Sequence, residues 1–313
     1  MKQSTFFRTW AAAGLCALPL LTLAQDCEAP NASANYLLGE AQGMPSAMHW
    51  DSGLVWARCA AGQAWDGANC TGAAAEAYWY HWTENSALLP QSFAGQERLD
   101  IATGPDQNPL ARGGWRLPYR SELAGLGAGC SIGPRLNQAV FPGTSAWVWT
   151  ASPHPEFPEL AWAANLHGGY TDIAYKPIPL PVLLVRGGQP FAPLQPSGPL
   201  AATAGQEVQS GPIVLEAAAG TLAWGGMRIA GAGSPAFQVN GGPWTREAIV
   251  ASGDIIRVRL TAPAGVGEAH NATLTLRSGQ TTGTAANAAN GGDESTSVQE
   301  STATFSVSAA AGG

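Results

Sequence analysis

The sequence has few charged residues for its length. Asp, Glu, Lys and Arg make up 12% of the 313 residues, and 22 acidic side chains outnumber 15 basic ones, which gives a formal net charge of −7. Nucleic-acid binding depends on basic side chains that neutralise phosphates. The balance of charge therefore argues against nucleic acid as a partner. Abundant Gly, Ala, Ser, Thr and Pro instead favour many short strands and loops.

The chain also lacks an apolar run long enough to span a membrane comfortably. Its one candidate, residues 10–23, is short and interrupted by a proline. Lys2 and Arg8 precede this run, and it ends in small residues at the point where signal peptidase would cleave after Ala24. We therefore expect residues 1–24 to be a signal peptide, with an uncleaved anchor as the alternative. The mature protein would then have no membrane span and would be periplasmic, on the cell surface or extracellular.

No Cys-x-x-Cys pair or cluster of histidines is present, so the sequence has no recognisable zinc site. Four cysteines follow residue 24, an even number in a chain that we expect to be exported to an oxidising compartment. We therefore predict two structural disulfides, for which three pairings exist. The four residues are Cys27, Cys59, Cys70 and Cys130.

Motifs of common enzyme classes are absent as well. There is no phosphate loop, no Gly-x-Ser-x-Gly elbow and no His-Glu-x-x-His. His154 and Glu156 form a close acid–base pair, but with Pro155 between them we interpret them as exposed loop residues. Asp51 and Asp172 lack the ligand spacing of a calcium site. We expect no enzyme activity, no metal and no cofactor.

The most informative stretch is residues 115–123, which read Trp-Arg-Leu-Pro-Tyr-Arg-Ser-Glu-Leu. Pro118 ends a strand, because proline lacks the backbone N–H that a sheet needs. With position 119 as the N-cap of a helix, Glu122 falls at N3, where its carboxylate reaches back to the N–H of the cap. Tyr119 cannot cap the helix with its ring, so about 0.5–2 kcal/mol of helix stabilisation is missing.

This stretch resembles the signature of the Lcl C-terminal domain family, which usually has Thr or Asn where this chain has Tyr119. Further blocks match in the same order, from about residue 27 to 190. They are Asp51-Ser52-Gly53-Leu54-Val55-Trp56, Arg58-Cys59 with Cys70-Thr71-Gly72, Phe141-Pro142, Trp149-Thr150-Ala151-Ser152-Pro153, Ala161-Trp162, Gly168-Gly169-Tyr170 and Val185-Arg186-Gly187-Gly188-Gln189.

The family is grouped with C-type-lectin-like folds, which implies an α+β domain over residues 25–189. Such folds are binding scaffolds more often than enzymes. The resemblance also favours a Cys59–Cys70 disulfide, which leaves Cys27 to pair with Cys130. The motif residues to which the resemblance gives a structural role are Trp56, Trp115, Arg116, Leu117, Pro118, Glu122, Trp149, Trp162 and Arg186.

Past residue 200 the chain changes to short strand patterns separated by turns. Apolar and charged residues alternate over 255–260, which is typical of a half-buried strand. Asn240-Gly241 predicts a tight turn. This half resembles an all-β immunoglobulin-like sandwich of bacterial surface proteins, which we place at residues 201–308 with a tail at 309–313.

Several connecting segments complete the expected organisation. Prolines make 190–200 a stiff linker between two independently folding units. Residues 279–300 have almost no bulky apolar side chains and predict a mobile loop. The polar stretch 94–113 is an insertion compared with the family. The apolar stripe within residues 73–89 predicts a helix.

Three functions stay open. The first is an exported, non-catalytic recognition or adhesion protein that binds a glycan, or a surface or matrix protein, through the lectin-like domain. The second is a structural or assembly component of a bacterial envelope or surface appendage. The third is an oxidase-like enzyme on the scaffold of the formylglycine-generating enzymes, which requires two free cysteines to bind copper. Oligomerisation is compatible with all three.

Residues 147–176 correspond by resemblance to the part of lectin-like folds that meets ligands. Trp149 and Trp162 in this segment match framework positions, so we assign them to the core. Tyr170 and Tyr175 are expected to be platforms for the ligand, because aromatic rings offer apolar area with little entropy to lose. The candidate ligand-binding residues are His154, Glu156, His167, Tyr170, Asp172 and Tyr175.

Overall fold

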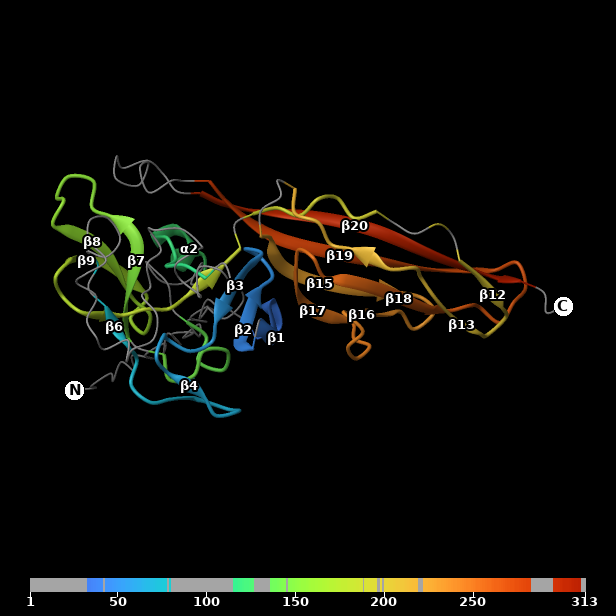
Figure 1. Ribbon diagram of the computed structural model, residues 1–313, viewed down its shortest axis with the longest axis horizontal. Helices are drawn as coiled ribbons and strands as arrows, with labels where there is room; N and C mark the ends of the chain where they lie inside the picture. The colour runs from blue at the N-terminus through green and yellow to red at the C-terminus, as the bar shows by residue number, and fades with distance from the viewer. Residues whose placement is uncertain are drawn as a thin grey trace, which may run out of the picture.

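The computed structural model describes residues 33–41, 43–77, 79, 115–126, 136–144, 146–187, 189–195, 198, 200–218, 222–282 and 295–310. The predicted signal peptide, the predicted Cys27–Cys130 disulfide and the 94–113 insertion lie outside these ranges. The described chain forms two parts that lie end to end, and the C-terminus is at the far tip of the second part (Figure 1).

A four-stranded antiparallel sheet forms one layer of the N-terminal part, in the order β1-β2-β3-β11. Val185 of β11 pairs with Trp56 of β3, so the end of this part returns beside its beginning. Trp56 and Val185 are both fully buried. The elements are a 3-10 turn η1 (Ser33–Asn35), β1 (Tyr36–Ala41), β2 (Met44–His49), β3 (Leu54–Ala57) and β11 (Val185–Arg186).

A three-stranded antiparallel sheet, β7-β8-β9, and two small strand pairs complete this part. The pairs are β4 with β5 and β6 with β10. A disulfide joins Cys59 to Cys70, which confirms the pairing that the resemblance favoured. The strands are β4 (Ala64–Trp65), β5 (Cys70–Thr71), β6 (Glu76–Ala77), β7 (Trp147–Pro153), β8 (Leu160–Asn165), β9 (Tyr170–Tyr175) and β10 (Leu180–Pro181).

The expectation of an α+β lectin-like fold is wrong. Within the described residues the only α-helix is α2 (Arg120–Leu126), and strands dominate both parts. The helix expected over 73–89 is also wrong where the chain is described, because residues 76–77 form β6. Helix propensity is a weak preference that tertiary contacts override. Here β6 pairs with β10, and the backbone N–H of Trp79 bonds to the carbonyl of Lys176 at 2.9 Å.

The C-terminal part is a sandwich of two sheets, which agrees with an all-β expectation for this half. One sheet has the order β12-β20-β19-β15-β17, with β12 parallel to β20, and the other is β13-β18-β14 with β16 on the free side of β18. That it is an immunoglobulin-like module stays a prediction. The strands are β12 (Leu200–Thr203), β13 (Glu207–Gln209), β14 (Ile213–Val214), β15 (Trp224–Gly231), β16 (Ala236–Val239), β17 (Glu247–Ala251), β18 (Ile255–Thr261), β19 (Ala269–Thr282) and β20 (Ser295–Ala310).

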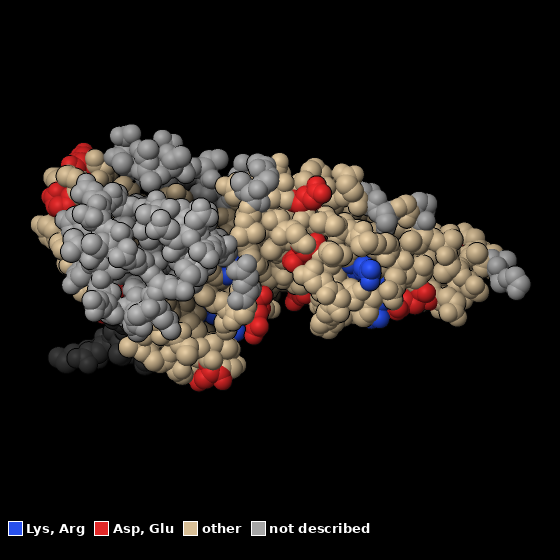
Figure 2. All heavy atoms as spheres, in the orientation of Figure 1, with Lys and Arg blue, Asp and Glu red and all other residues tan. Residues whose placement is uncertain are grey.

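The core of the sandwich takes side chains from both sheets. Met227 and Phe305 come from the first sheet, and Phe237 and Val258 from the second. Burial alternates along β18, as its sequence predicted. The surface outside this core carries few charges on the face drawn in Figure 2, where most spheres over the sandwich are uncharged residues.

Two segments expected to be connections take part in the sandwich. Phe191 and Leu194, from the predicted linker, are buried in the core of the second part. Strand pairing also continues into the predicted loop 279–300, since Gly279 pairs with Val298 and residue 282 with 295. The division into two independently folding units stays a prediction.

The two parts approach each other closely at glycines. Gly279 of β19 donates its N–H to the carbonyl of Gly53 at 2.9 Å, and a Cβ at Gly279 would lie 2.5 Å from the carbonyl oxygen of Ser52. A Cβ at Gly226 of β15 would lie 2.6 Å from Sδ of Met48 in β2. A side chain at these positions would therefore force the two parts away from each other.

Arg186 lies at the same junction and is fully buried. Its Cζ is 3.5 Å from the ring centroid of Trp115 and 4.0 Å from that of Trp224 in β15. Nη2 donates to the carbonyl of Ala41 at 3.2 Å, whereas Nε and Nη1 have no hydrogen-bond partner. Burial lowers the pKa of this guanidinium. One indole from each part thus holds the arginine in place.

The glycine contact can be tested with Gly279→Ala. We expect the free energy of unfolding to fall by about 1–3 kcal/mol, because the added methyl group meets the backbone of the other part and both must shift. Urea unfolding of the purified protein measures the change. Gly211→Ala is the matched control, since a Cβ there has no atom within 4 Å. Equal losses in the two variants would contradict the close packing.

Candidate functional site

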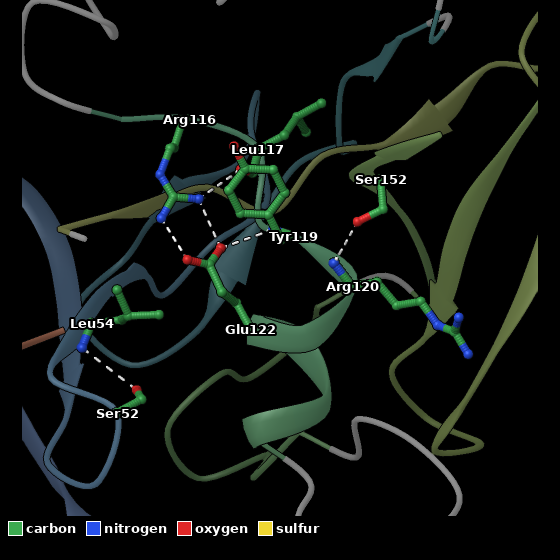
Figure 3. Close-up of polar contacts among 8 residues, drawn as sticks. All are labelled: Ser52, Leu54, Arg116, Leu117, Tyr119, Arg120, Glu122 and Ser152. Carbon is green, nitrogen blue, oxygen red and sulfur yellow. Dashed lines mark hydrogen bonds and ion pairs between the residues drawn. The ribbon is translucent and has the colours of Figure 1, made fainter. Parts of the chain in front are cut away.

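The motif of residues 115–123 forms a corner between a bridge to β11 and the start of α2. The backbone of Arg116 exchanges two hydrogen bonds with Val185, at 2.9 and 3.0 Å. Its guanidinium pairs with both oxygens of Glu122, at 2.5 and 2.7 Å (Figure 3). Oε2 of Glu122 also accepts the N–H of Tyr119 at 2.8 Å, which confirms the predicted capping contact. The Glu122 side chain is fully buried.

The helix cap that Tyr119 cannot provide comes from β7. Oγ of Ser152 accepts the backbone N–H of Arg120 at 2.9 Å, and Ser152 is buried. The neighbouring N–H of Ala151 bonds to the carbonyl of Pro118 at 2.7 Å. These two contacts fix the beginning of α2 against the β7-β8-β9 sheet. In Figure 3 the side chain of Arg120 points away from the Arg116–Glu122 pair.

The register of β8 and β9 assigns the candidate residues to two faces of the sheet. Trp162 pairs with Ile173, and Leu160 with Tyr175. Paired residues of antiparallel strands share a face, and successive residues of one strand alternate between faces. Tyr170 is five positions from Tyr175, so the two tyrosines lie on opposite faces and about 17 Å apart along the strand. They are therefore not two platforms of one surface.

One face of the sheet carries an exposed group of side chains around Trp162, which we call the Trp162 face. It consists of Arg120, His154, Trp162, Ile173 and Tyr175, joined at its rim by Phe157. The guanidinium of Arg120 lies 3.7 Å from the Trp162 ring centroid, and the His154 ring stacks on the same indole at 5.9 Å. Tyr175 is 58% exposed and Ile173 is 42% exposed. The stacked groups are thus positioned beside exposed apolar side chains.

His154 is held by the turn that follows β7. Its Nδ1 accepts the backbone N–H groups of Glu156 and Phe157, both at 3.2 Å. The ring of Phe157 lies 5.0 Å from the His154 ring. An Nδ1 that accepts two hydrogen bonds leaves the proton of the neutral ring on Nε2. The side chain of Glu156 is exposed in the same turn.

Tyr170 and Asp172 lie on the other face of the sheet, and His167 lies in the turn between β8 and β9. Tyr170 meets the ring of Trp147 edge-on at 5.5 Å and accepts from the side chain of Asn165 at 3.4 Å. Nε2 of His167 donates to the carbonyl of Thr144 at 2.9 Å. Asp172 accepts the N–H of Ile173 at 2.8 Å. The structure thus separates these three from His154 and Tyr175.

Residues 47–186 match the model of the Lcl C-terminal domain family. This segment of the chain belongs to that family. The Lcl C-terminal domain begins within β2, ends at Arg186, and contains the motif corner and both faces of the β7-β8-β9 sheet. Membership indicates an exported protein of the surface type. No curated protein and no solved structure matches the chain significantly.

Two further findings concern all the described residues. Among the described residues, no group of three His, Cys, Asp or Glu side chains could hold a metal ion. No helix in the described ranges is both long and apolar enough to cross a membrane.

Arg120, Ile173 and Phe157 were not among the residues predicted for the site. Trp149 and Trp162 were both predicted to belong to the core, but the Trp162 indole is partly exposed, whereas Trp149 is buried. The alternation of side chains between the two faces of a strand, applied to residues 160–175, could have identified this face from the sequence. It places Trp162, Ile173 and Tyr175 on one face once the hairpin turn at Gly168-Gly169 fixes the register.

Glu122→Gln tests the motif corner. We expect a loss of about 2–4 kcal/mol in the free energy of unfolding, because glutamine removes the negative charge that pairs with the Arg116 guanidinium and replaces one buried acceptor oxygen with a donor. The matched control is Glu300→Gln, which removes an exposed pair with Arg277 at 2.6 Å and should cost less than about 1 kcal/mol. Chemical unfolding measures both, and equal costs would contradict the structural role of the corner.

Proposed function

We propose that this chain is an exported, non-catalytic recognition or adhesion protein that binds a glycan or a protein through the Trp162 face of its Lcl C-terminal domain. The observation that carries the proposal is the grouping of exposed apolar side chains with a stacked guanidinium. Tyr175, Ile173 and Phe157 are each more than 40% exposed, and Arg120 lies among them on the Trp162 ring.

The composition of this face supports binding. Aromatic residues and arginine are enriched where proteins meet partners, because they combine apolar area with hydrogen-bond donors. Arg120 donates through Nε to Oγ1 of Thr171 at 3.3 Å, and it has no carboxylate partner among the described residues. Stacking on Trp162 orders the side chain before a ligand arrives, which reduces the entropy lost on binding.

The environment of His154 supports a role without catalysis. A general base must have a free nitrogen in reach of the proton that it abstracts. Nδ1 of His154 already accepts two backbone N–H groups, so this atom holds the turn together. The disulfide between Cys59 and Cys70 also removes two of the cysteines that an oxidase-like site would need in the free form.

Tyr175→Ala tests the proposal. The wild-type protein is first screened against an array of glycans and extracellular-matrix proteins, and its affinity for a bound probe is then measured. We expect Tyr175→Ala to weaken that affinity by at least about tenfold, or 1.4 kcal/mol, with little change in melting temperature. The matched control is Tyr170→Ala, which removes an exposed tyrosine from the opposite face of the same strand and should leave the affinity unchanged.

Two other outcomes would point to a different binding face or to a different function. A loss of binding in Tyr170→Ala alone would place the ligand on the other face of the sheet. Failure of the wild-type protein to bind any member of the array would contradict the recognition function. That result would leave the second candidate, a structural component of an envelope or appendage, which the tight packing between the two parts of the chain favours.

A further inference from the structure

His154 occupies a position in its turn that Asp or Asn occupies elsewhere in this domain. Oδ1 of Asp66 accepts the N–H groups of Ala68 and Asn69, two and three residues further on, at 2.8 and 2.7 Å. Oδ1 of Asn165 accepts those two and three residues beyond it at 3.1 and 2.6 Å. Nδ1 of His154 makes the same pair of contacts. An imidazole nitrogen thus replaces the usual side-chain oxygen.

The replacement makes this turn sensitive to protons. Imidazole is the side chain that normally gains its charge between about pH 8 and 5. When a solvent proton binds to Nδ1, this nitrogen becomes a donor. The backbone N–H groups of Glu156 and Phe157 then lose their acceptor, because the protonated Nδ1 is itself a donor. Turns built on Asp66 and Asn165 undergo no such change in this pH range, because their oxygens remain acceptors.

Several charged groups lie near the His154 ring. Arg120 of α2 lies over the same indole as His154, and Glu156 and Glu159 belong to the same turn. Lys176, after β9, donates its N–H to the carbonyl of Glu159 at 3.0 Å and places Nζ over Trp79. Asp172 of β9 bonds to its own strand. None of these groups forms an ion pair with His154 in the described structure.

We propose that His154 is a pH switch for the Trp162 face. At neutral and higher pH the unprotonated ring holds residues 154–159 in the observed turn, with Phe157 beside the face. Protonation of Nδ1 in mild acid releases the turn, displaces Phe157 and weakens ligand binding. The last step rests on the proposed function, whereas the opening of the turn does not.

Hydrogen exchange tests the opening of the turn. The peptide that contains residues 154–160 is followed by mass spectrometry at about pH 7.5 and about pH 5.5, with His154→Asn measured in parallel and each rate divided by the intrinsic exchange rate of its own sequence at that pH. Asn supplies Oδ1 as a permanent acceptor. We expect wild-type protection of this peptide, relative to His154→Asn, to fall by about tenfold in acid, because both hydrogen bonds to Nδ1 are lost.

His167→Asn is the second control. It removes another histidine of the same sheet, whose Nε2 donates to Thr144, and should leave the pH response of residues 154–160 intact. An identical pH response in wild type and His154→Asn would overturn the proposal. Loss of the response in His167→Asn would also overturn it, because the sensing group would then be the other imidazole.

Binding completes the test. An array member that is bound at about pH 7.5 should lose affinity for the wild-type protein at about pH 5.5 and keep it for His154→Asn. Equal wild-type affinity at both pH values, with the turn open in acid, would overturn the link between the turn and the face. If no array member binds at either pH while the exchange response is present, the switch stands and the proposed function fails.

Discussion

The packing of Arg186 between Trp115 and Trp224 joins the two parts of this protein. A buried guanidinium loses its hydration, and here one carbonyl and two indole faces replace it. Trp115 belongs to the Lcl C-terminal domain, and Trp224 belongs to β15 of the sandwich. The arginine is therefore fully surrounded only when both parts are folded and docked. The family match ends at Arg186. The last residue of the Lcl C-terminal domain therefore packs against Trp224, a side chain from the sandwich.

The junction is connected to the Trp162 face through a short piece of chain. Trp115 stacks on Arg186, and its neighbour Arg116 binds Glu122 at the start of α2. Four residues after Arg116, the N–H of Arg120 bonds to Ser152, and its guanidinium lies on Trp162. Each contact fixes a backbone position or a planar side chain. Residues 115–123 thus connect the junction of the two parts to the Trp162 face through a series of fixed contacts.

Local chemistry explains which features the sequence could predict. The Glu122 contact to Tyr119 and the turn at Asn240, with its positive φ, depend on residues next to one another in the chain, and the structure has both. The strand expected before Pro118 is reduced to an isolated bridge between Arg116 and Val185. The Ala-rich stretch before Trp79 was mispredicted as a helix, because its strand partner lies about a hundred residues away at β10. Side-chain propensity carries no information about such a distant partner.

The sequence predicted His154 and Tyr175 of the Trp162 face, and it missed the others for a related reason. Tyr170 and Tyr175 were grouped as similar residues on one strand, although an odd separation places them on opposite faces. The cap at Arg120 comes from Ser152, which no local pattern reveals. Phe191 likewise reads as part of a proline-rich linker, yet its ring is buried in the sandwich. In each case the deciding contact is between segments that only the folded chain brings together.

Arginines stacked on aromatic rings recur throughout the described structure, and their second partners distinguish Arg120 from the others. Those that also pair with a carboxylate are Arg116, Arg228, Arg259 and Arg277. Arg58 and Arg186 instead donate to the carbonyls of Val140 and Ala41, and neither is exposed. Arg120 is exposed, and the described structure gives its side chain one neutral partner, Thr171. Stacking therefore positions this guanidinium while most of its donors remain directed to solvent, where a ligand on the Trp162 face would meet them.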